Sequence, residues 1–127
     1  MDEQKERTTQ PLGTTRPIVV LCGSTRFYET FQRENLRLTV AGSIVLSIGA
    51  AKEPDGATFA HLDPGEYARV KADLDRLHFD KLALANRVGG PGSHALILNV
   101  GGYIGESTRN EMDYASSIGL PMRFLEA

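Results

Sequence analysis

The chain has little of what several classes of protein depend on. Its 127 residues include one cysteine and three histidines, and tryptophan is absent. A single cysteine excludes an internal disulfide, and the histidines show no metal-binding spacing, so we expect no metal site and no cofactor. No apolar run approaches the length of a membrane span, and no secretory signal is visible. These absences predict a cytoplasmic protein without a membrane partner.

An excess of charge of one sign is also missing. Fourteen basic and sixteen acidic residues give a formal net charge of −2, and the two signs are mixed along the chain. Domains that bind nucleic acids usually carry a basic stripe with aromatic side chains that stack on bases, and neither pattern occurs here. The sequence therefore predicts no nucleic-acid partner.

Apolar runs and helical patterns alternate along most of the chain. Strands are predicted at residues 18–22, 43–47, 95–98 and 121–125, and helices at 27–41, at 66–86 and from about residue 107. The polar residues 1–16 are expected to form a flexible tail, residues 17–127 a single domain, and residues 48–65 a long loop. The alternation predicts an α/β fold: a doubly wound parallel sheet of four to five strands in a flavodoxin-like or Rossmann-like three-layer sandwich.

The helix predicted at 66–86 carries several chemically distinct residues. Its predicted buried stripe consists of Val70, Leu74, Leu77 and Leu84. Asp80 lies on one edge of this stripe and His78 on the other. From that edge His78 could reach a cleft, although a histidine at such a position is usually a surface residue. We expect Cys22, at the end of the first strand, to be a small core residue rather than a nucleophile.

Two predicted helix starts offer groups that bind anions. The first follows the strand at 18–22, where backbone N–H groups and the helix dipole favour a negative charge and Arg26 can pair with a phosphate. An ordinary glycine turn with a helix cap and a solvated arginine would give the same residues. The second follows the strand at 95–98. The candidate binding residues at the two sites are Gly23, Ser24, Thr25, Arg26, Asn99, Gly101, Ser107 and Thr108.

Glu111 has two interpretations. It lies on one line of the last helix with Ala115 and Ile118, so its side chain is expected on the face that packs against the sheet. Thr108 and Glu111 have the spacing of a capping box, which would explain the glutamate as a helix cap. Alternatively, Glu111 points into a cleft at the carboxyl ends of the strands, where open parallel sheets bind their ligands.

The order of these motifs resembles the nucleoside 2-deoxyribosyltransferase-like family, including the 2′-deoxynucleoside 5′-phosphate N-hydrolases. The resemblance covers residues 18–125 and rests on three motifs: Gly-Ser-Thr-Arg after the first strand, Asp80-Lys-Leu-Ala-Leu-Ala, and Gly-x-x-x-x-x-Glu-x-x-x-Ala ending at Ala115. It implies cleavage, by hydrolysis or transfer, of the N-glycosidic bond of a nucleoside or nucleoside 5′-monophosphate. It further implies a homo-oligomer.

The resemblance also implies roles for single residues. Glu111 matches the glutamate that attacks the anomeric carbon, and Asp80 an acid that orients the sugar or assists the leaving base. The residues matching those that hold the 5′-phosphate are Gly23, Ser24, Arg26 and Ser107. Asn99 departs from the acid that transferases often carry at this strand end, which leaves the source of the base's proton open.

Two rival functions fit parts of the pattern. The Cys-Gly-Ser start and the Gly-Gly-Tyr-x-Gly turn are also similar to phosphoribohydrolases that activate cytokinins, although their Pro-Gly-Gly-x-Gly-Thr-x-x-Glu signature is broken here. A nucleotide sensor without catalytic activity would keep the anion-binding turns. Detection of a released base separates the enzymes from the sensor.

Overall fold

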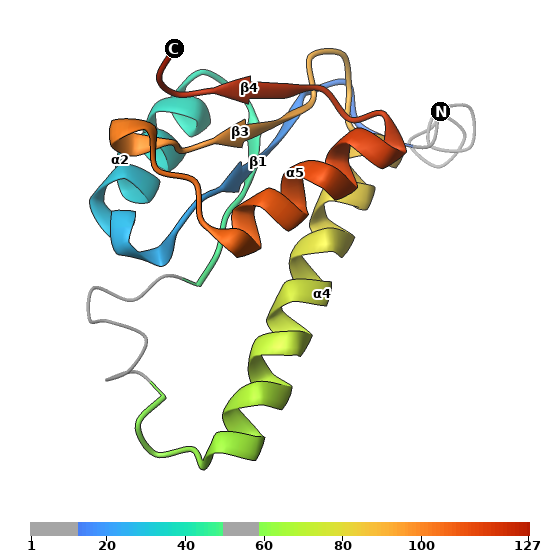
Figure 1. The fold of residues 1–127 in the computed structure, drawn as a ribbon. Helices are drawn as coiled ribbons and strands as arrows, with labels where there is room; N and C mark the ends of the chain where they lie inside the picture. The colour runs from blue at the N-terminus through green and yellow to red at the C-terminus, as the bar shows by residue number, and fades with distance from the viewer. Residues whose placement is uncertain (1–12, 50–58) are drawn as a thin grey trace, which may run out of the picture.

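The computed structural model describes residues 13–49 and 59–127 and confirms the predicted fold class. Four parallel strands form one sheet, and helices cover both of its faces (Figure 1). The elements are β1 (Ile18–Cys22), η1 (Thr25–Phe27), α2 (Tyr28–Val40), β2 (Ile44–Leu46), α4 (Pro64–Val88), β3 (His94–Ile97), η2 (Val100–Gly102), α5 (Glu106–Ile118) and β4 (Met122–Phe124). The sequence predicted both ends of each strand and of α2 and α4, and the start of α5, to within two residues of these bounds.

The order of the strands determines where a ligand can bind. The sheet runs β2-β1-β3-β4, and every neighbouring pair is parallel. From β1 the chain moves outward to β2 on one side of the sheet, and from β3 it moves outward to β4 on the other side. The connections therefore diverge at the carboxyl ends of β1 and β3, which is where sheets of this class open a crevice.

The sheet separates two apolar cores. On one face, α2 packs through Phe31 and Leu38 against alternate residues of β1 and β3. On the other face, α4 and α5 pack through Leu82, Ala85 and Ala115. Because both faces are covered, β1 and β3 are buried along their whole length. Their uninterrupted apolar sequences follow from this two-sided burial.

Helix α4 is longer than the sheet that it packs against. Its start is fixed by a capping box, in which Asp63 accepts a hydrogen bond from the Glu66 N–H at 2.8 Å and Glu66 accepts one from the Asp63 N–H at 3.1 Å. Its 25 residues span ~37 Å, whereas a five-residue strand spans ~17 Å. The N-terminal half of α4 therefore extends beyond the sheet, as Figure 1 shows.

The predicted buried stripe of α4 is wrong. Leu74, Leu77 and Leu84 are 48%, 49% and 39% exposed. The α4 residues that are buried are His78, Leu82 and Ala85. The prediction failed for Leu74 because no strand lies beneath the N-terminal half of α4. Leu77 and Leu84 belong to the C-terminal half but lie on a different side of the helix from the buried residues His78, Leu82 and Ala85. The C-terminal half is turned so that His78 points inward.

Two other predictions concern the segments outside the helices and strands. The predicted tail 1–16 and loop 48–65 lie partly outside the described residues. Within the described part, the Thr14 N–H donates to the Val88 carbonyl at 2.8 Å, and the Arg16 guanidinium donates to the Gly42 carbonyl at 2.8 Å. Residues 14–16 are therefore hydrogen-bonded to the domain. A bilayer crossing needs a long helix with almost no charge, and the described helices include none of that kind.

Candidate active site

A cleft of about 670 Å³ lies at the carboxyl ends of β1 and β3. The turn after β1 forms one wall, the start of α5 forms another, and the N-terminal half of α4 closes the third side. The polar residues that line it are Ser24, Thr25, Lys71, Asp75, His78, Lys81, Tyr103, Glu106, Ser107, Thr108 and Glu111. The cleft occupies the place that the strand order predicts for a ligand.

Glu111 lies on the wall of this cleft and is not part of a capping box. Helix α5 begins at Glu106, and its N-cap is Gly105, which provides no side chain to bond the helix start. The predicted caps at Ser107 and Thr108 are therefore wrong, because both residues already lie within the helix. The side chain of Glu111 is 12% exposed, and its contacts are with Cys22 and His78. The helix-cap interpretation of Glu111 is thereby removed.

Three chemically active side chains meet beside the cleft. The Sγ atom of Cys22 lies 3.3 Å from Nε2 of His78, and the same nitrogen lies 3.7 Å from Oε1 of Glu111. Cys22 comes from the end of β1, His78 from the middle of α4 and Glu111 from α5. Of the two alternatives for His78, the surface position is wrong, since only 4% of the residue is exposed, and the position at the cleft is confirmed.

Burial keeps this cluster uncharged near neutral pH. It raises the pKa of the Glu111 carboxyl to about 8, assisted by the negative charge of Asp75, while Lys71 and the Cys22 thiol lower it less. Burial likewise raises the pKa of Cys22, with Glu111 contributing, and lowers the pKa of His78 to about 4 with a contribution from Lys81. At pH 7 the cluster is therefore mainly a carboxylic acid, a thiol and a neutral imidazole.

The protonation states decide what the cluster can do. The contact between His78 and Glu111 joins two neutral groups and is not an ion pair. A thiol with a raised pKa is a poor nucleophile, which supports the expectation that Cys22 does not attack a substrate. Glu111 is the member that faces the cleft with a titratable oxygen, and a carboxyl with a strongly shifted pKa in a cleft is a candidate catalytic group.

The turn after β1 is built for close approach. A Cβ atom on Gly23 would lie 3.0 Å from Cβ of Leu98, so glycine lets this turn pack against the chain that follows β3. Ser24 caps η1 by accepting the Arg26 N–H at 3.3 Å. Gly23, Ser24 and Thr25 line the cleft. The guanidinium of Arg26 lies 4.1 Å above the ring of Tyr103, which also lines it.

The start of α5 faces the same cleft. Ser107 and Thr108 both line it, as the sequence predicted for a second set of donors. Nζ of Lys71 lies 3.5 Å from the hydroxyl of Ser107 and adds a positive charge from α4. An anion at this position would face helix N–H groups, a hydroxyl and an ammonium. Lys71 was not among the residues predicted from the sequence.

Asn99 and Gly101 are bonded to the C-terminal segment and do not line the cleft. The Asn99 amide donates to the Glu126 carbonyl at 2.9 Å, and its oxygen accepts the Glu126 N–H at 2.9 Å. The Gly101 N–H donates to the Glu126 carboxylate at 3.1 Å. Both residues were predicted to bind substrate, but these bonds give them a structural role at the end of β3.

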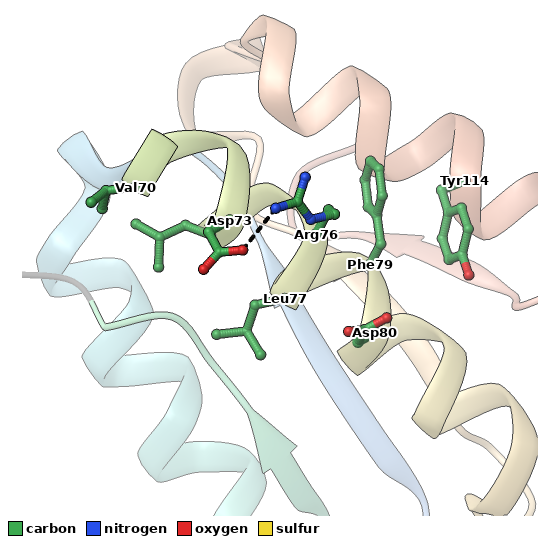
Figure 2. Close-up of a pocket in the computed structure, with 8 residues that line it drawn as sticks. Val70, Asp73, Arg76, Leu77, Phe79, Asp80 and Tyr114 are labelled. Atoms are coloured by element: carbon green, nitrogen blue, oxygen red, sulfur yellow. Dashed lines mark hydrogen bonds and ion pairs between the residues drawn. The ribbon is translucent and has the colours of Figure 1, made fainter. Parts of the chain in front are cut away.

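Asp80 also lies away from the cleft. It lines a second hollow of about 590 Å³, here called the outer groove, formed by Val70, Asp73, Leu74, Arg76, Leu77, Phe79, Asp80 and Tyr114. Figure 2 shows Asp80 in this groove beside the stacked rings of Phe79 and Tyr114, whose centroids are 4.8 Å apart. The structure therefore does not bring Asp80 and Glu111 together. The aspartate of α4 that lines the cleft with Glu111 is Asp75.

The residues that sequence reasoning missed share one signal with His78. Lys71, Asp75 and His78 recur at positions i, i+4 and i+7 of α4 and therefore form one polar line along the helix. All three line the cleft.

Comparison of the chain with protein-family models, with curated proteins and with solved structures gave no match. A function for this chain is therefore inferred from the arrangement of the residues that line its cleft.

Proposed function

We propose that the protein cleaves the N-glycosidic bond of a nucleoside or nucleoside 5′-monophosphate, with Glu111 as the nucleophile. The observation that supports this most is the place of Glu111 on the wall of a cleft between two anion-binding turns. A cleft of about 670 Å³ is large enough for a small molecule of nucleotide size. This function is also the one that the resemblance in the sequence implies. The fold alone does not test that resemblance.

The reaction needs a carboxylate at the anomeric carbon. When the bond between base and sugar breaks, the electron pair leaves with the base, and the sugar develops oxocarbenium character. An ionised Glu111 oxygen bonds to the anomeric carbon and forms a glycosyl ester, which water or an acceptor base then cleaves. The departing base takes up a proton from water in the cleft. No other step requires a charged group from the protein.

Ionisation of Glu111 limits this reaction near neutral pH. A pKa of about 8 leaves roughly one molecule in ten with the carboxylate at pH 7. The same burial that raises the pKa removes water from the carboxylate once it forms, which strengthens its attraction to a positively charged transition state. The site therefore makes ionised Glu111 rare near neutral pH but more reactive once it forms.

Asp75, as a carboxylate, is our candidate for the acidic residue that orients the sugar. It lines the cleft, and its negative charge contributes to the raised pKa of Glu111, so the two carboxyl groups are close enough to interact electrostatically. Asp80, which the resemblance suggested, lies in the outer groove instead. We therefore assign to Asp75 the role that the resemblance implied for Asp80.

A 5′-phosphate would bind between the two helix starts. Backbone N–H groups at Gly23 and Ser24 and at Ser107 and Thr108 provide donors, and Lys71 supplies a positive charge next to Ser107. Arg26 can reach the same ligand only from its position above Tyr103. We therefore expect Lys71 to contribute more to phosphate binding than Arg26 does.

The homo-oligomer and the cytoplasmic location expected from the sequence stay predictions. A second copy of the chain is the occupant we propose for the outer groove, since the groove carries exposed Leu74 and Leu77 together with charges of both signs. Such a self-complementary mixture suits contact between two identical surfaces.

The test is release of free base from a panel of substrates. The purified full chain is incubated with 2′-deoxynucleosides, ribonucleosides and the 5′-monophosphates of both, and chromatography measures free base. Release from deoxynucleotides or deoxynucleosides supports the proposal. Release only from ribonucleoside monophosphates would support the phosphoribohydrolase instead. Binding of nucleotides without any release would support the sensor and contradict the proposal.

A further inference from the structure

Three ligand atoms of different kinds meet at the cluster of Cys22, His78 and Glu111. They are the sulfur of Cys22, Nε2 of His78 and a carboxylate oxygen of Glu111, and all lie within 4.8 Å of one another. Each comes from a different element, and β1, α4 and α5 are fixed relative to one another by the apolar core they share. The positions of the three atoms are therefore set by the fold.

The two distances from His78 are close to those of a tetrahedral metal site. A zinc ion with bonds of about 2.0–2.3 Å to nitrogen, oxygen and sulfur holds its ligand atoms about 3.3–3.6 Å apart. The observed distances from Nε2 are 3.3 Å to the Cys22 sulfur and 3.7 Å to the Glu111 oxygen. The third pair, the Cys22 sulfur and the Glu111 oxygen, lies within 4.8 Å, so movement of the Glu111 side chain toward the other two atoms would complete three corners of a tetrahedron.

The chemistry of the donors selects the type of ion. Calcium and magnesium prefer sites made of oxygen, whereas zinc accepts sulfur, nitrogen and oxygen in one site. Binding would release the protons of the Cys22 thiol and the Glu111 carboxyl, and the two resulting negative charges would balance a divalent cation. The charged groups of α4 that line the adjacent cleft are Lys71, Asp75 and Lys81.

Two of the three ligands line the cleft. Glu111 and His78 do so, whereas Cys22 lies behind them and is 1% exposed. A fourth ligand, from water or from a bound molecule, can therefore approach from the cleft. We propose that Cys22, His78 and Glu111 form a zinc-binding site with its fourth position open to the cleft.

This site goes beyond the proposed function and competes with it. A zinc ion would use the same carboxylate oxygen that the glycosidase reaction needs, so zinc would inhibit base release reversibly. The Nδ1 atom of His78 is buried without a partner among the described residues. Because an outer hydrogen bond at that nitrogen usually strengthens a zinc site by about 10–100-fold, we expect an affinity lower by that factor than in sites that have one.

The test uses cobalt(II) as a spectroscopic probe of the full chain after removal of metals with a chelator. Cobalt should bind with one equivalent per chain and give a thiolate-to-metal charge-transfer band together with the visible bands of a tetrahedral ion. Zinc should displace it and abolish both. Cys22→Ser should remove the charge-transfer band, and both Cys22→Ser and His78→Gln should weaken zinc binding by at least about tenfold.

Matched variants distinguish binding at these three ligands from binding at another carboxylate of the cleft. Glu106→Gln changes a carboxylate at the rim of the same cleft and should leave the cobalt spectrum unchanged. If Cys22→Ser does not fold, as judged by circular dichroism, Glu111→Gln removes a ligand with little change in shape and should weaken zinc binding. Absence of the charge-transfer band in the wild type, or unchanged zinc binding in the folded ligand variants, overturns the proposal.

The zinc site and the glycosidase activity are tested by different measurements. Metal binding requires no substrate, so a cobalt spectrum in a protein that releases no base would leave the zinc site intact and remove the proposed function. If the protein shows no cobalt band but releases base in a reaction that depends on Glu111, the zinc site is contradicted and the proposed function is supported. If both hold, zinc should inhibit base release and a chelator should restore it.

Discussion

The cleft and the outer groove share one wall and differ in their chemistry. Both are lined by Val70, Leu74 and Leu77 of α4, and their volumes are similar, about 670 and 590 Å³. The cleft joins turns from three parts of the chain and holds a buried carboxyl with a raised pKa. The outer groove holds the exposed ion pair of Asp73 and Arg76 at 2.8 Å, labelled in Figure 2.

The difference shows what makes an acidic residue a candidate catalyst. Glu111 is buried next to Cys22 and His78, so its pKa is raised to about 8. Asp80, although it matches a family motif, is exposed in a hollow formed by α4 and Tyr114. Burial beside other titratable groups, rather than the match to a motif, distinguishes the two positions.

The largest effect that could break this comparison comes from the two aspartates of α4. Asp75→Asn should lower kcat for base release by about 10²-fold at pH 9, where Glu111 is ionised in both proteins, because it removes the carboxylate that orients the sugar in the cleft. Asp80→Asn is the matched control, and its kcat should stay within about twofold of wild type. Steady-state kinetics on one deoxynucleotide measures both. The reverse result would return the role of this carboxylate to Asp80 and place the reaction in the outer groove.

The pH dependence of activity tests the ionisation of Glu111. As a nucleophile Glu111 must be deprotonated, and burial raises its pKa to about 8, so kcat/KM should rise about tenfold per pH unit below pH 8 and then level off. The measurement is made with a chelator present. A rate that is already constant above pH 5 would mean that the attacking group has an ordinary carboxyl pKa.

Phosphate recognition is expected to show a smaller effect. Lys71→Ala should weaken binding of a nucleoside 5′-monophosphate by about 10–100-fold, which corresponds to ~1.5–3 kcal/mol, and should leave nucleoside binding nearly unchanged. Arg26→Ala, which removes an exposed guanidinium stacked on Tyr103, should cost less. Calorimetric titrations of both ligands provide the values. Equal losses for nucleoside and nucleotide would contradict a phosphate site beside Lys71.

The outer groove is tested by a change of mass rather than of rate. Leu77→Glu places a charge in the groove and should convert the expected homo-oligomer to a monomer, measured by light scattering. Leu36→Glu is the control, since Leu36 is 66% exposed on α2, on the other side of the sheet. A monomeric wild type would contradict the oligomer. A wild-type oligomer that persists in Leu77→Glu would place the contact elsewhere.

Much of the fold follows from local sequence, because the deciding interactions are local or repeat along one element. Strands β1 and β3 are continuous apolar runs, and burial on both faces requires that pattern. The inward direction of Glu111 follows from its line with Ala115 on α5. The turns at Gly23 and Ser107 could be placed at a common crevice because parallel strands end at the same edge.

The partners of Glu111 could not be predicted in the same way. Cys22 and His78 are 56 residues apart in the chain, and their contact depends on the rotation of α4 about its own axis. The leucines of the predicted stripe suggested the wrong rotation, because two of them lie on a different side of α4 from its buried residues and the third lies beyond the sheet. Asp75 and Asp80, five residues apart, lie ~140° apart around the helix and therefore face different hollows. Asp80 was chosen from its match to a motif, which contains no information about this rotation.

The central claim is that Glu111 attacks the anomeric carbon, and the substitution Glu111→Gln tests it most directly. Glutamine keeps the size of the side chain but is a poor nucleophile, so base release should fall by at least about 10³-fold while nucleotide binding stays near wild type. Glu106→Gln, on the same helix and at the same cleft, should remain active. A folded Glu111→Gln protein that releases base at the wild-type rate would contradict the claim.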